Sequence, residues 1–525
     1  MSSQETMLQA TTMWELLEAR AAASPDVVVL IDQDDREITF GALRDLAERT
    51  AAGLHGMGVT AGTRVTWQLP TRIETVALSL ALARLGAVQN PIIPIYRDRE
   101  VGFVVGQTGA EFLCVPGDWN GFDFVAMAER IAADHGVAPT VLVTYDSLPS
   151  GDPSTLPPAP TDGEGVRWIY YTSGTTSAPK GVKHSDSTLM AGGLGLADAL
   201  ELTTDDVGSI AFPYAHIAGP DYLMMLLYRG CGAVIVEAFQ LEAAVDLFSR
   251  KGATMAGGGP AFYQMYLAKQ RTQPGVPIIP SLRLLSGGGA PKPPEMFVEV
   301  LEEMGIPVCH GYGMTECPMI AQGGPTDTHD QLMFSDGAPV TGIHIRMVDA
   351  DGRVCGPGED GEVRLKGPMV FKGYTDSSLD ADAFDSDGWF RTGDLGHIDE
   401  SGHVVLTGRL KDVIIRKGEN ISAKEIEDLL YQHPLVNDVA VVGLPDRERG
   451  ERVCAVVERV PGADDLTLEE MVSYLKAADL MMQKVPEQLE ILDELPRNQT
   501  LRKVLKQDIR DMFRDKPWSP PPRRS

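Results

Sequence analysis

The first 240 residues alternate between short apolar runs and longer segments with helical periodicity. Residues 27–31 form an apolar run with the length of a buried strand, and residues 40–57 then repeat Leu and Ala at helical spacing. The same pattern predicts strands at residues 64–69, 167–172 and 233–237, and a largely apolar helix over Ile73–Leu85. Such alternation predicts mainly parallel sheets covered by helices, which is an α/β fold.

The last fifth of the chain is built from shorter units. The pattern predicts a helix over Ala423–Tyr431, a strand at residues 439–442 and a second helix starting near Leu468. Thr467 and Glu470 have the spacing of a capping box at the start of that helix. We expect a separate small α/β domain here, because 525 residues are too many for one hydrophobic core.

Composition and charge narrow the function classes. Hydrophobic residues make up 43% and charged residues 23%, an ordinary globular mixture. Lys and Arg number 46 against 74 Asp and Glu, so the formal net charge is −28. A surface this acidic repels polyanions, which argues against a nucleic-acid or anionic-membrane binder.

The sequence also bears on targeting, on membrane spans and on the redox state of the cysteines. The N-terminus has no basic stretch followed by an apolar one, so we expect no signal peptide. The longest apolar stretch, residues 76–88, is interrupted by Arg84 and is shorter than the ~20 residues that a membrane span needs. The six cysteines are scattered without a CxxC pair, which favours reduced thiols in a cytoplasmic protein.

The strongest chemical signal is the sequence YYTSGTTSAPKG at residues 170–181, directly after a predicted strand. Hydroxyl groups and backbone N–H groups around a glycine turn suit a polyphosphate, and Lys180 adds a positive charge. This is not the P-loop of the GxxxxGK[ST] type, because Gly181 follows the lysine. By itself the segment is also compatible with a flexible Ser/Thr-rich loop.

Further segments follow in a familiar order. The chain contains PYAHIAG at 213–219, SGGGAP at 286–291, GYGMTE at 311–316, GEVRLKGPMVFKGY at 361–374, GWFRTGDLG at 388–396 and GRLKDVIIRKGENI at 408–421. With the 170–181 loop, this series resembles the core motifs of the adenylate-forming superfamily of acyl-CoA synthetases, luciferases and nonribosomal-peptide adenylation domains.

The resemblance implies an ATP site with bound Mg²⁺. Glu316 would hold the metal, Asp394 would accept hydrogen bonds from the ribose hydroxyls, and Arg409 would contact the ribose and phosphates. Tyr312 would stack on or flank the adenine, where small residues leave room for the base. The implied nucleotide contacts are Thr172, Ser173, Gly174, Thr175, Thr176, Lys180, Gly288, Gly289, Ala290, Gly311, Tyr312, Gly313, Thr315, Asp394, Arg409, Lys411, Lys417 and Gly418.

The implied catalytic residues are Lys180, His216, Thr315, Glu316 and Lys503. His216 lies where the family often has a histidine at the mouth of the acyl pocket, and it either gates the carboxylate or packs. The resemblance makes Lys411 the hinge about which a small domain turns between two half-reactions. It divides the chain into an AMP- and acyl-binding domain (1–409), a mobile C-terminal domain (410–515) and a disordered tail (516–525).

The C-terminal motif departs from the family. The expected Pro-x-x-x-x-Gly-Lys is PRNQTLRK at 496–503, without the glycine and one residue longer. Lys503 matches by its local context and Arg502 by strict spacing, so the adenylation residue is one of the two. Arg416, Lys417 and both of these residues would join Lys180 and Arg409 in a local cationic patch for anionic substrates.

The resemblance implies activation of a carboxylic acid by ATP and transfer of the acyl group to coenzyme A. The N-terminal half is similar to ligases for fatty acids and for alicyclic acids such as cyclohexanecarboxylate, which favours an apolar monocarboxylate. Candidate pocket residues are Phe212, Tyr214, Met224, Met225 and 257–259. The sequence leaves open whether the protein forms a homodimer.

Three alternatives are weaker. A freestanding adenylation enzyme would load the acid onto a carrier protein instead of coenzyme A. An amino-acid-activating enzyme would place an aspartate near Gly219, and Asp221 is close to that position but follows Pro220. A non-enzymatic nucleotide binder would not need Lys180 and Glu316 together.

Overall fold

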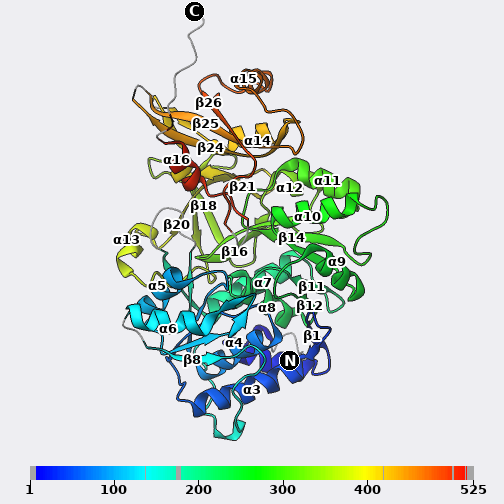
Figure 1. Cartoon of the computed structure of the whole chain (residues 1–525), viewed down its shortest axis with the longest axis vertical. Coiled ribbons are helices and arrows are strands. Elements are labelled where there is room, and N and C mark those ends of the chain that lie inside the picture. Colours follow the sequence, from blue (N-terminus) through cyan, green and yellow to red (C-terminus); the bar gives the residue numbers. More distant parts are fainter. Residues whose placement is uncertain are drawn as a thin grey trace, which may run out of the picture.

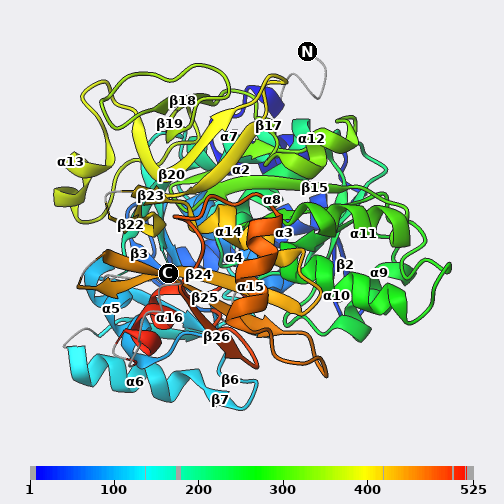
Figure 2. The same ribbon diagram turned by 90° about the horizontal axis from the view of Figure 1, so that it is seen from above.

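The computed structural model describes residues 7–135, 138–172, 179–417, 419–447, 449–498, 502–514 and 516. The elements up to β21 (Val404–Arg409) form the larger body, and those after it form a smaller cap on one end, orange and red in Figure 1. Seen from above, the C-terminal strands and α15 (Leu468–Ala477) lie across the larger body (Figure 2).

Of the first three sheets of the larger body, two are mainly parallel and one has two parallel and two antiparallel strand pairs. The first has the order β11 (Val207–Ile210), β12 (Gly232–Ile235), β1 (Val28–Ile31) and β2 (Glu37–Thr39). The second is β10 (Gly181–Ser185), β9 (Val166–Tyr171), β4 (Val88–Pro91), β3 (Arg64–Trp67), β5 (Phe112–Val115) and β8 (Thr140–Val143). The third is β13 (Met255–Gly258), β14 (Leu284–Gly288), β15 (Val308–Met314), β16 (Cys317–Gln322) and β17 (Ala338–Pro339). Helices connect their parallel strands, as the alternation predicts.

The fourth sheet is antiparallel throughout, which the alternation did not predict. Its order is β18 (His344–Val348), β19 (Gly361–Lys366), β20 (Phe390–Ile398) and β21. Only residues 399–403 join β20 to β21, too few for the crossover that a parallel pair needs. This sheet carries Asp394 and Arg409, directly opposite each other on paired strands.

The C-terminal part has one further sheet. Its strands are β23 (Glu419–Ile421), β22 (Ile414–Arg416), β25 (Gly450–Arg459) and β24 (Val436–Asp446), with β26 (Gln488–Leu492) parallel to β25. The helices are α14 (Ala423–Tyr431), α15 and α16 (Lys506–Phe513). Both predicted helices are present, and the capping box of Thr467 and Glu470 is formed.

The helices of the larger body begin and end close to the predicted positions. Ile73–Leu85 is helical (α4) and buried on every side, which explains why it is apolar throughout. The remaining helices are α2 (Met13–Ala23), α3 (Phe40–Gly56), α5 (Asp98–Thr108), α6 (Phe124–His135), α7 (Asp186–Ala199), α8 (Ala218–Arg229), α9 (Leu241–Arg250), α10 (Pro260–Arg271), α11 (Pro294–Met304), α12 (His329–Phe334) and α13 (Asp380–Ala383).

The hydrophobic cores before the β21–β22 connection are separate from those after it. The largest core joins the first three sheets and runs from Met7 to Leu332, and the core of the antiparallel sheet reaches Val404. The two C-terminal cores begin at Ile414. The cores are therefore separate on either side of residues 404–414, and the boundary at 409–410 stays a prediction.

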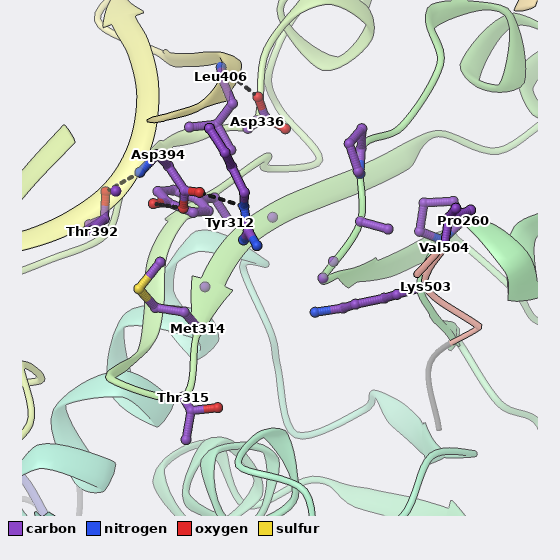
Figure 3. Close-up of a pocket in the computed structure, with 18 of the residues that line it drawn as sticks. Pro260, Tyr312, Met314, Thr315, Asp336, Thr392, Asp394, Leu406, Lys503 and Val504 are labelled. Carbon is purple, nitrogen blue, oxygen red and sulfur yellow. Dashed lines mark hydrogen bonds and ion pairs between the residues drawn. The ribbon is translucent and has the colours of Figure 1, made fainter. Parts of the chain in front are cut away.

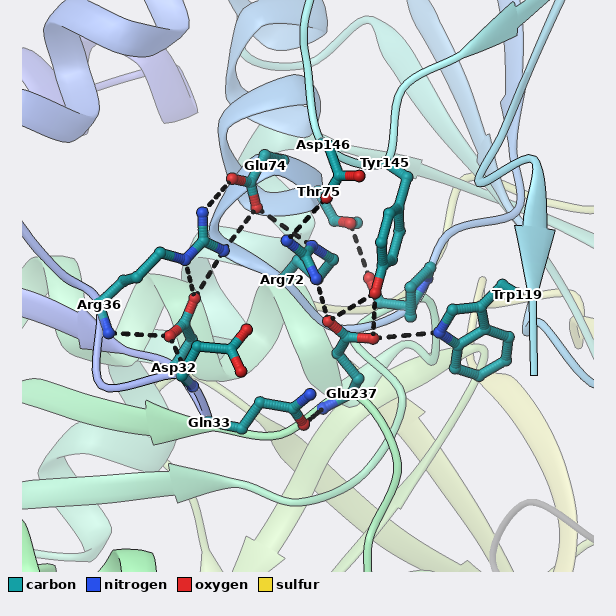
Figure 4. A network of polar contacts seen from close by, with 12 residues as sticks. Asp32, Gln33, Arg36, Arg72, Glu74, Thr75, Trp119, Tyr145, Asp146 and Glu237 are labelled. Atoms are coloured by element: carbon teal, nitrogen blue, oxygen red, sulfur yellow. Dashed lines mark hydrogen bonds and ion pairs between the residues drawn. The ribbon is translucent and has the colours of Figure 1, made fainter.

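A polar network at the N-terminus of α4 ties the first two sheets together (Figure 4). The Arg72 side chain pairs with Glu237 and lies over the ring of Tyr145, 4.0 Å from its centroid. Next to it, the Thr71 hydroxyl accepts a hydrogen bond from the backbone N–H of Tyr214 at 2.9 Å. The network therefore fixes the start of the 213–219 segment, which leads into the cavity described below.

All six cysteines are unpaired, as predicted. Among the described residues, no helix has the length and apolar character needed to cross a membrane.

Candidate active site

A cavity of about 1010 Å³ lies between the larger body and the C-terminal part (Figure 3). It is lined by the ends of β14 and β15, by β20 and β21, by the start of α8, by α14 and by residues 502–507. Of the nucleotide-contact and catalytic residues that the resemblance implies, those that the structure describes line this cavity, with the exception of Lys417. Ser173, Gly174, Thr175, Thr176 and Gly418 lie outside the described residues.

The two ends of the predicted phosphate loop are pinned together. The backbone N–H of Thr172 donates to the carbonyl of Lys180 at 3.1 Å, and the N–H of Lys180 donates to the Thr172 hydroxyl at 3.3 Å. The Lys180 ammonium lies 5.1 Å from the centroid of the Tyr374 ring. The loop therefore starts and ends at the cavity with its lysine directed along one wall.

Glu316 is held next to that lysine. The Tyr374 hydroxyl donates to Glu316 Oε1 at 2.8 Å, and burial raises the pKa of Glu316 while Tyr374 and Lys180 lower it. His184 Nε2 donates to the carbonyl of Thr315 at 2.7 Å, because a carbonyl oxygen can only accept, and burial lowers the pKa of His184 to about 4. The turn that carries Thr315 and Glu316 is therefore fixed on both sides.

Asp394 forms the centre of a second polar group. The Tyr312 hydroxyl donates to Asp394 Oδ2 at 2.7 Å, and Arg409 Nε donates to Asp394 Oδ1 at 2.7 Å (Figure 3). Asp394 is 3% exposed, so these two donors offset the cost of burying its charge. Carboxylate lone pairs not used by them remain for hydroxyl donors such as those of a ribose.

The glycines of the predicted adenine site are required by a close backbone approach. A Cβ atom at Gly288 would lie 2.3 Å from the carbonyl oxygen of Gly311, on the neighbouring parallel strand. A Cβ at Gly311 would lie 2.3 Å from Gln322 Oε1. Both glycines line the cavity. Because they have no side chain, the backbones can approach closely and the cavity wall leaves room for a flat base.

His216 lines the cavity at the start of α8, which favours a role in the site over packing alone. The backbone N–H of Ala218 donates to His216 Nδ1 at 3.3 Å. Burial lowers the pKa of His216 to about 3, so the ring is neutral and its proton lies on Nε2. His216 can therefore donate one hydrogen bond from Nε2 to an acceptor such as a carboxylate.

The two candidates of the C-terminal motif both line the cavity but have different surroundings. Lys503 extends into the cavity toward the side that holds Tyr312 and Asp394 (Figure 3), and burial lowers its pKa to about 8. Arg502 pairs with the exposed Glu494. Arg502 also has a φ of +56°, a conformation that glycine adopts without strain. Arg502 therefore stands at the motif's glycine position, directly before the lysine.

Two hydrogen bonds with Asn498 hold Lys503 in this position. The backbone N–H of Lys503 donates to Asn498 Oδ1 at 3.0 Å, and the N–H of Asn498 donates to the carbonyl of Lys503 at 2.8 Å. The Arg497 guanidinium pairs with Asp438 on β24. The described residues on either side of 499–501 are thereby held next to each other, and Arg497 joins them to the C-terminal sheet.

The remaining predicted cationic residues differ in whether they line the cavity. Lys411 lines the cavity, next to Arg409 and at the junction of the two sheets. Lys417 does not line the cavity and lies in the turn between β22 and β23, and Arg416 pairs with Glu487. Lys417 was predicted at the nucleotide and Arg416 in the cationic patch, but neither lines the cavity in this structure.

The predicted acyl pocket is partly correct. Phe212, Gly257 and Gly258 line the cavity. Tyr214, Met224 and Met225 are fully buried in the large core instead, because one side of α8 packs there. Leu196, Ile217 and Ala218 are apolar lining residues that the sequence did not single out.

Three residues of the site were missed individually. Tyr374 ends a segment that resembles a family motif, so that segment was the available signal for it. His184 follows the phosphate loop, and its distance of 131 positions from Thr315 hides their contact in the sequence. Asp336 lines the cavity and accepts a hydrogen bond from the N–H of Leu406 at 2.9 Å (Figure 3), again a pairing of distant segments.

The fold and this cavity define an adenylate-forming enzyme with a nucleotide site between a large and a small α/β part. The chain belongs to the family of AMP-binding enzymes, which it matches over residues 17–375. Residues 425–501 match the C-terminal domain of AMP-binding enzymes. It is an enzyme of the acid–thiol ligase class, with named fatty-acid–CoA ligases among its homologues.

Relatives and solved structures agree with this assignment. The chain is 30% identical to the medium-chain fatty-acid–CoA ligase of Escherichia coli K12, covering 91% of this chain and 86% of the relative. It is 32% identical to the salicyl-AMP ligase / salicyl-S-ArCP synthetase of Mycobacterium tuberculosis, covering 92% and 88%. ATP-bound MatB from Rhodopseudomonas palustris superposes with a TM-score of 0.84 at 29% identity, covering 95% of this chain and 99% of that chain.

Proposed function

We propose that this enzyme activates an apolar carboxylic acid with ATP and transfers the acyl group to coenzyme A, releasing AMP and pyrophosphate. The observation that carries the proposal is the meeting of Lys503, Asp394 with Arg409, and Glu316 with Lys180 around one cavity that has an apolar end. Three unlike groups are thus available at one place: a cation for the reacting carboxylate, acceptors for a ribose, and a carboxylate–lysine pair for phosphates.

In the first half-reaction, an oxygen of the substrate carboxylate attacks the α-phosphorus of ATP, and the bond to the bridging oxygen breaks to release pyrophosphate. Lys503 would neutralise charge on the carboxylate and α-phosphate, and His216 Nε2 would orient the carboxylate. Lys180 would neutralise the departing pyrophosphate. Such catalysis rests on positioning and charge stabilisation and needs no covalent protein intermediate.

Glu316 fits a Mg²⁺ ion, which prefers carboxylate and phosphate oxygens. Its Oε1 is held by Tyr374, and its carboxylate lines the cavity beside Lys180. Bound there, Mg²⁺ would neutralise phosphate charge. The protein's own part is to hold the carboxylate in place through Tyr374 and the turn through His184.

In the second half-reaction, the thiol of coenzyme A attacks the acyl carbon and AMP leaves. The predicted C-terminal domain, residues 410–515, would turn about Lys411 and withdraw Lys503 so that the thiol can enter. The break between hydrophobic cores near residues 404–414 supports such a hinge. We place the enzyme in the cytoplasm, where ATP and coenzyme A are available.

Transfer to a carrier protein is the second candidate. It is favoured by the salicyl-AMP ligase / salicyl-S-ArCP synthetase of Mycobacterium tuberculosis, whose name includes a carrier-linked product and which covers 92% of this chain. The two functions share the first half-reaction and differ in the thiol acceptor.

The test is a panel of fatty, alicyclic and aromatic acids with ATP and Mg²⁺, measuring pyrophosphate release and then thioester formation with free coenzyme A. We expect pyrophosphate release only with an acid present, and a CoA thioester as product. Acyl-adenylate formation without any use of free coenzyme A, but with transfer to a carrier protein, would replace the ligase by the carrier-loading function.

A further inference from the structure

Within the described part of the chain, one carboxyl group of the cavity lacks a hydrogen-bond partner. Asp221, in the first turn of α8, lines the cavity and is 2% exposed. Its Oδ1 atom is enclosed without a hydrogen-bond partner among the described residues. An aspartate buried this way is rare, because leaving a buried polar group without a hydrogen bond is energetically unfavourable.

The backbone of α7 packs closely against the Asp221 side chain. Gly192 on α7 faces the side chain so closely that a Cβ atom at Gly192 would lie 2.3 Å from Asp221 Oδ1 and 3.0 Å from the ring of Pro318. The hydroxyl of Tyr170 is also enclosed without a hydrogen-bond partner. The backbone of α7 therefore leaves room for a carboxyl group that no protein donor satisfies.

Asp221 is also far from compensating charge. Burial alone raises the pKa of Asp221 to about 8, and no cationic side chain counteracts the shift. At neutral pH the group is mainly protonated, so it can both donate and accept a hydrogen bond. Asp394, another buried carboxylate of the cavity, has Tyr312 and Arg409 as donors.

We propose that Asp221 binds a hydroxyl group on the hydrocarbon part of the substrate acid. The inference rests on the proposed function and specifies its substrate class as a hydroxylated carboxylic acid. The neighbouring lining residues Phe212, Ile217 and Ala218 are apolar and accept the rest of the acyl group.

A hydroxyl fits this position better than an ammonium group. An ammonium would require Asp221 to ionise, and a buried ion pair is stable only when further hydrogen bonds satisfy both charges. Among the described residues, none forms such a bond with Asp221 Oδ1. A hydroxyl donates and accepts, so it pairs with the neutral carboxyl without creating a buried charge.

The test compares matched acids that differ by one hydroxyl: benzoic and the hydroxybenzoic acids, cyclohexanecarboxylic acid and its hydroxylated forms, octanoic and the hydroxyoctanoic acids. For the unaltered enzyme we expect kcat/KM for pyrophosphate release to be at least 10-fold higher for one hydroxylated acid than for its parent. A site that hydrogen-bonds a substrate hydroxyl discriminates strongly against the analogue that lacks it.

The variants are Asp221→Leu, Asp221→Asn and the control Leu223→Met on the same helix, away from the cavity lining. Asp221→Leu should bring the hydroxylated-to-parent ratio close to 1 and raise the melting temperature, because it removes an unpaired buried polar group. Asp221→Asn should retain part of the ratio, because an amide also donates and accepts. Leu223→Met should keep the ratio of the unaltered enzyme.

Each outcome decides the inference. A ratio unchanged in Asp221→Leu, no preference for any hydroxylated acid, or a preference for amino-substituted acids would overturn it while leaving the ligase function intact. Absence of pyrophosphate release with every acid would refute the proposed function instead. In that case calorimetric binding of the same acid pairs, without ATP, still measures whether the hydroxyl preference depends on Asp221.

Discussion

Replacing Lys503 with alanine should slow acyl-adenylate formation far more than replacing Arg502. The Lys503 ammonium lies in the cavity, where burial lowers its pKa from 10.5 to about 8. At ~1.4 kcal/mol per pKa unit, the charged form is held roughly 3 kcal/mol above its value in water. An anionic carboxylate and α-phosphate beside it recover that energy, which makes the ammonium an effective electrostatic stabiliser.

The expected size follows from this contact. Loss of one positioned charge in a closed site costs ~2–4 kcal/mol of transition-state stabilisation, a rate decrease of about 30- to 1000-fold. Arg502→Ala removes an exposed pair with Glu494, worth ~0–1 kcal/mol of stability, and should change the rate by no more than a few-fold.

The assay measures the two half-reactions separately in each variant. Pyrophosphate exchange reports adenylation, and thioester formation from preformed acyl-adenylate reports transfer. Transfer should survive in both variants, since Lys503 serves only the first half-reaction. If Arg502→Ala abolishes adenylation and Lys503→Ala does not, the assignment made from the cavity is wrong. If neither does, Lys180 carries the phosphate charge without a C-terminal partner.

Four further outcomes are expected. Glu316→Gln should lose most adenylation, by ~2–4 kcal/mol, with an unchanged melting temperature, because it removes the charge of the proposed metal ligand; near-normal pyrophosphate exchange in a folded variant would exclude that role. Tyr374→Phe should weaken adenylation about 10-fold, as expected for one hydrogen bond of ~1.5 kcal/mol, and raise the Mg²⁺ concentration needed for half-maximal rate; an unchanged Mg²⁺ dependence would contradict the positioning of Glu316. Lys411→Pro should preserve adenylation and abolish thioester formation, because proline fixes φ at the proposed hinge; equal loss of both steps would place the pivot elsewhere. Lys503 is charged below its pKa of about 8 and neutral above it, so kcat/KM for adenylation should fall as the pH rises through 8. Lys503→Arg should move that fall to higher pH, because arginine keeps its charge. An identical fall at alkaline pH in both enzymes would show that another group titrates.

The sequence alone determined the class of fold and the family. Apolar runs and helical periodicity are local properties, so α4 and α14 are found at the predicted boundaries and the strands within a few residues. The motif series predicted Glu316, Asp394 and Arg409 as residues of one site for the same reason, since each motif is a continuous segment that can be read without knowing its neighbours, and all three line the cavity.

Only the tertiary structure decided which distant groups meet. The Tyr374–Glu316 and His184–Thr315 contacts join segments 58 and 131 positions apart, and no periodicity encodes such a pairing. The different surroundings of Lys503 and Arg502 likewise depend on tertiary contacts, because Asn498 holds the backbone of Lys503 and Glu494 pairs with Arg502. The unpaired state of Asp221 depends equally on how close α7 packs to α8, because a buried carboxyl is distinguished from a surface one by what surrounds it, not by its position in the sequence.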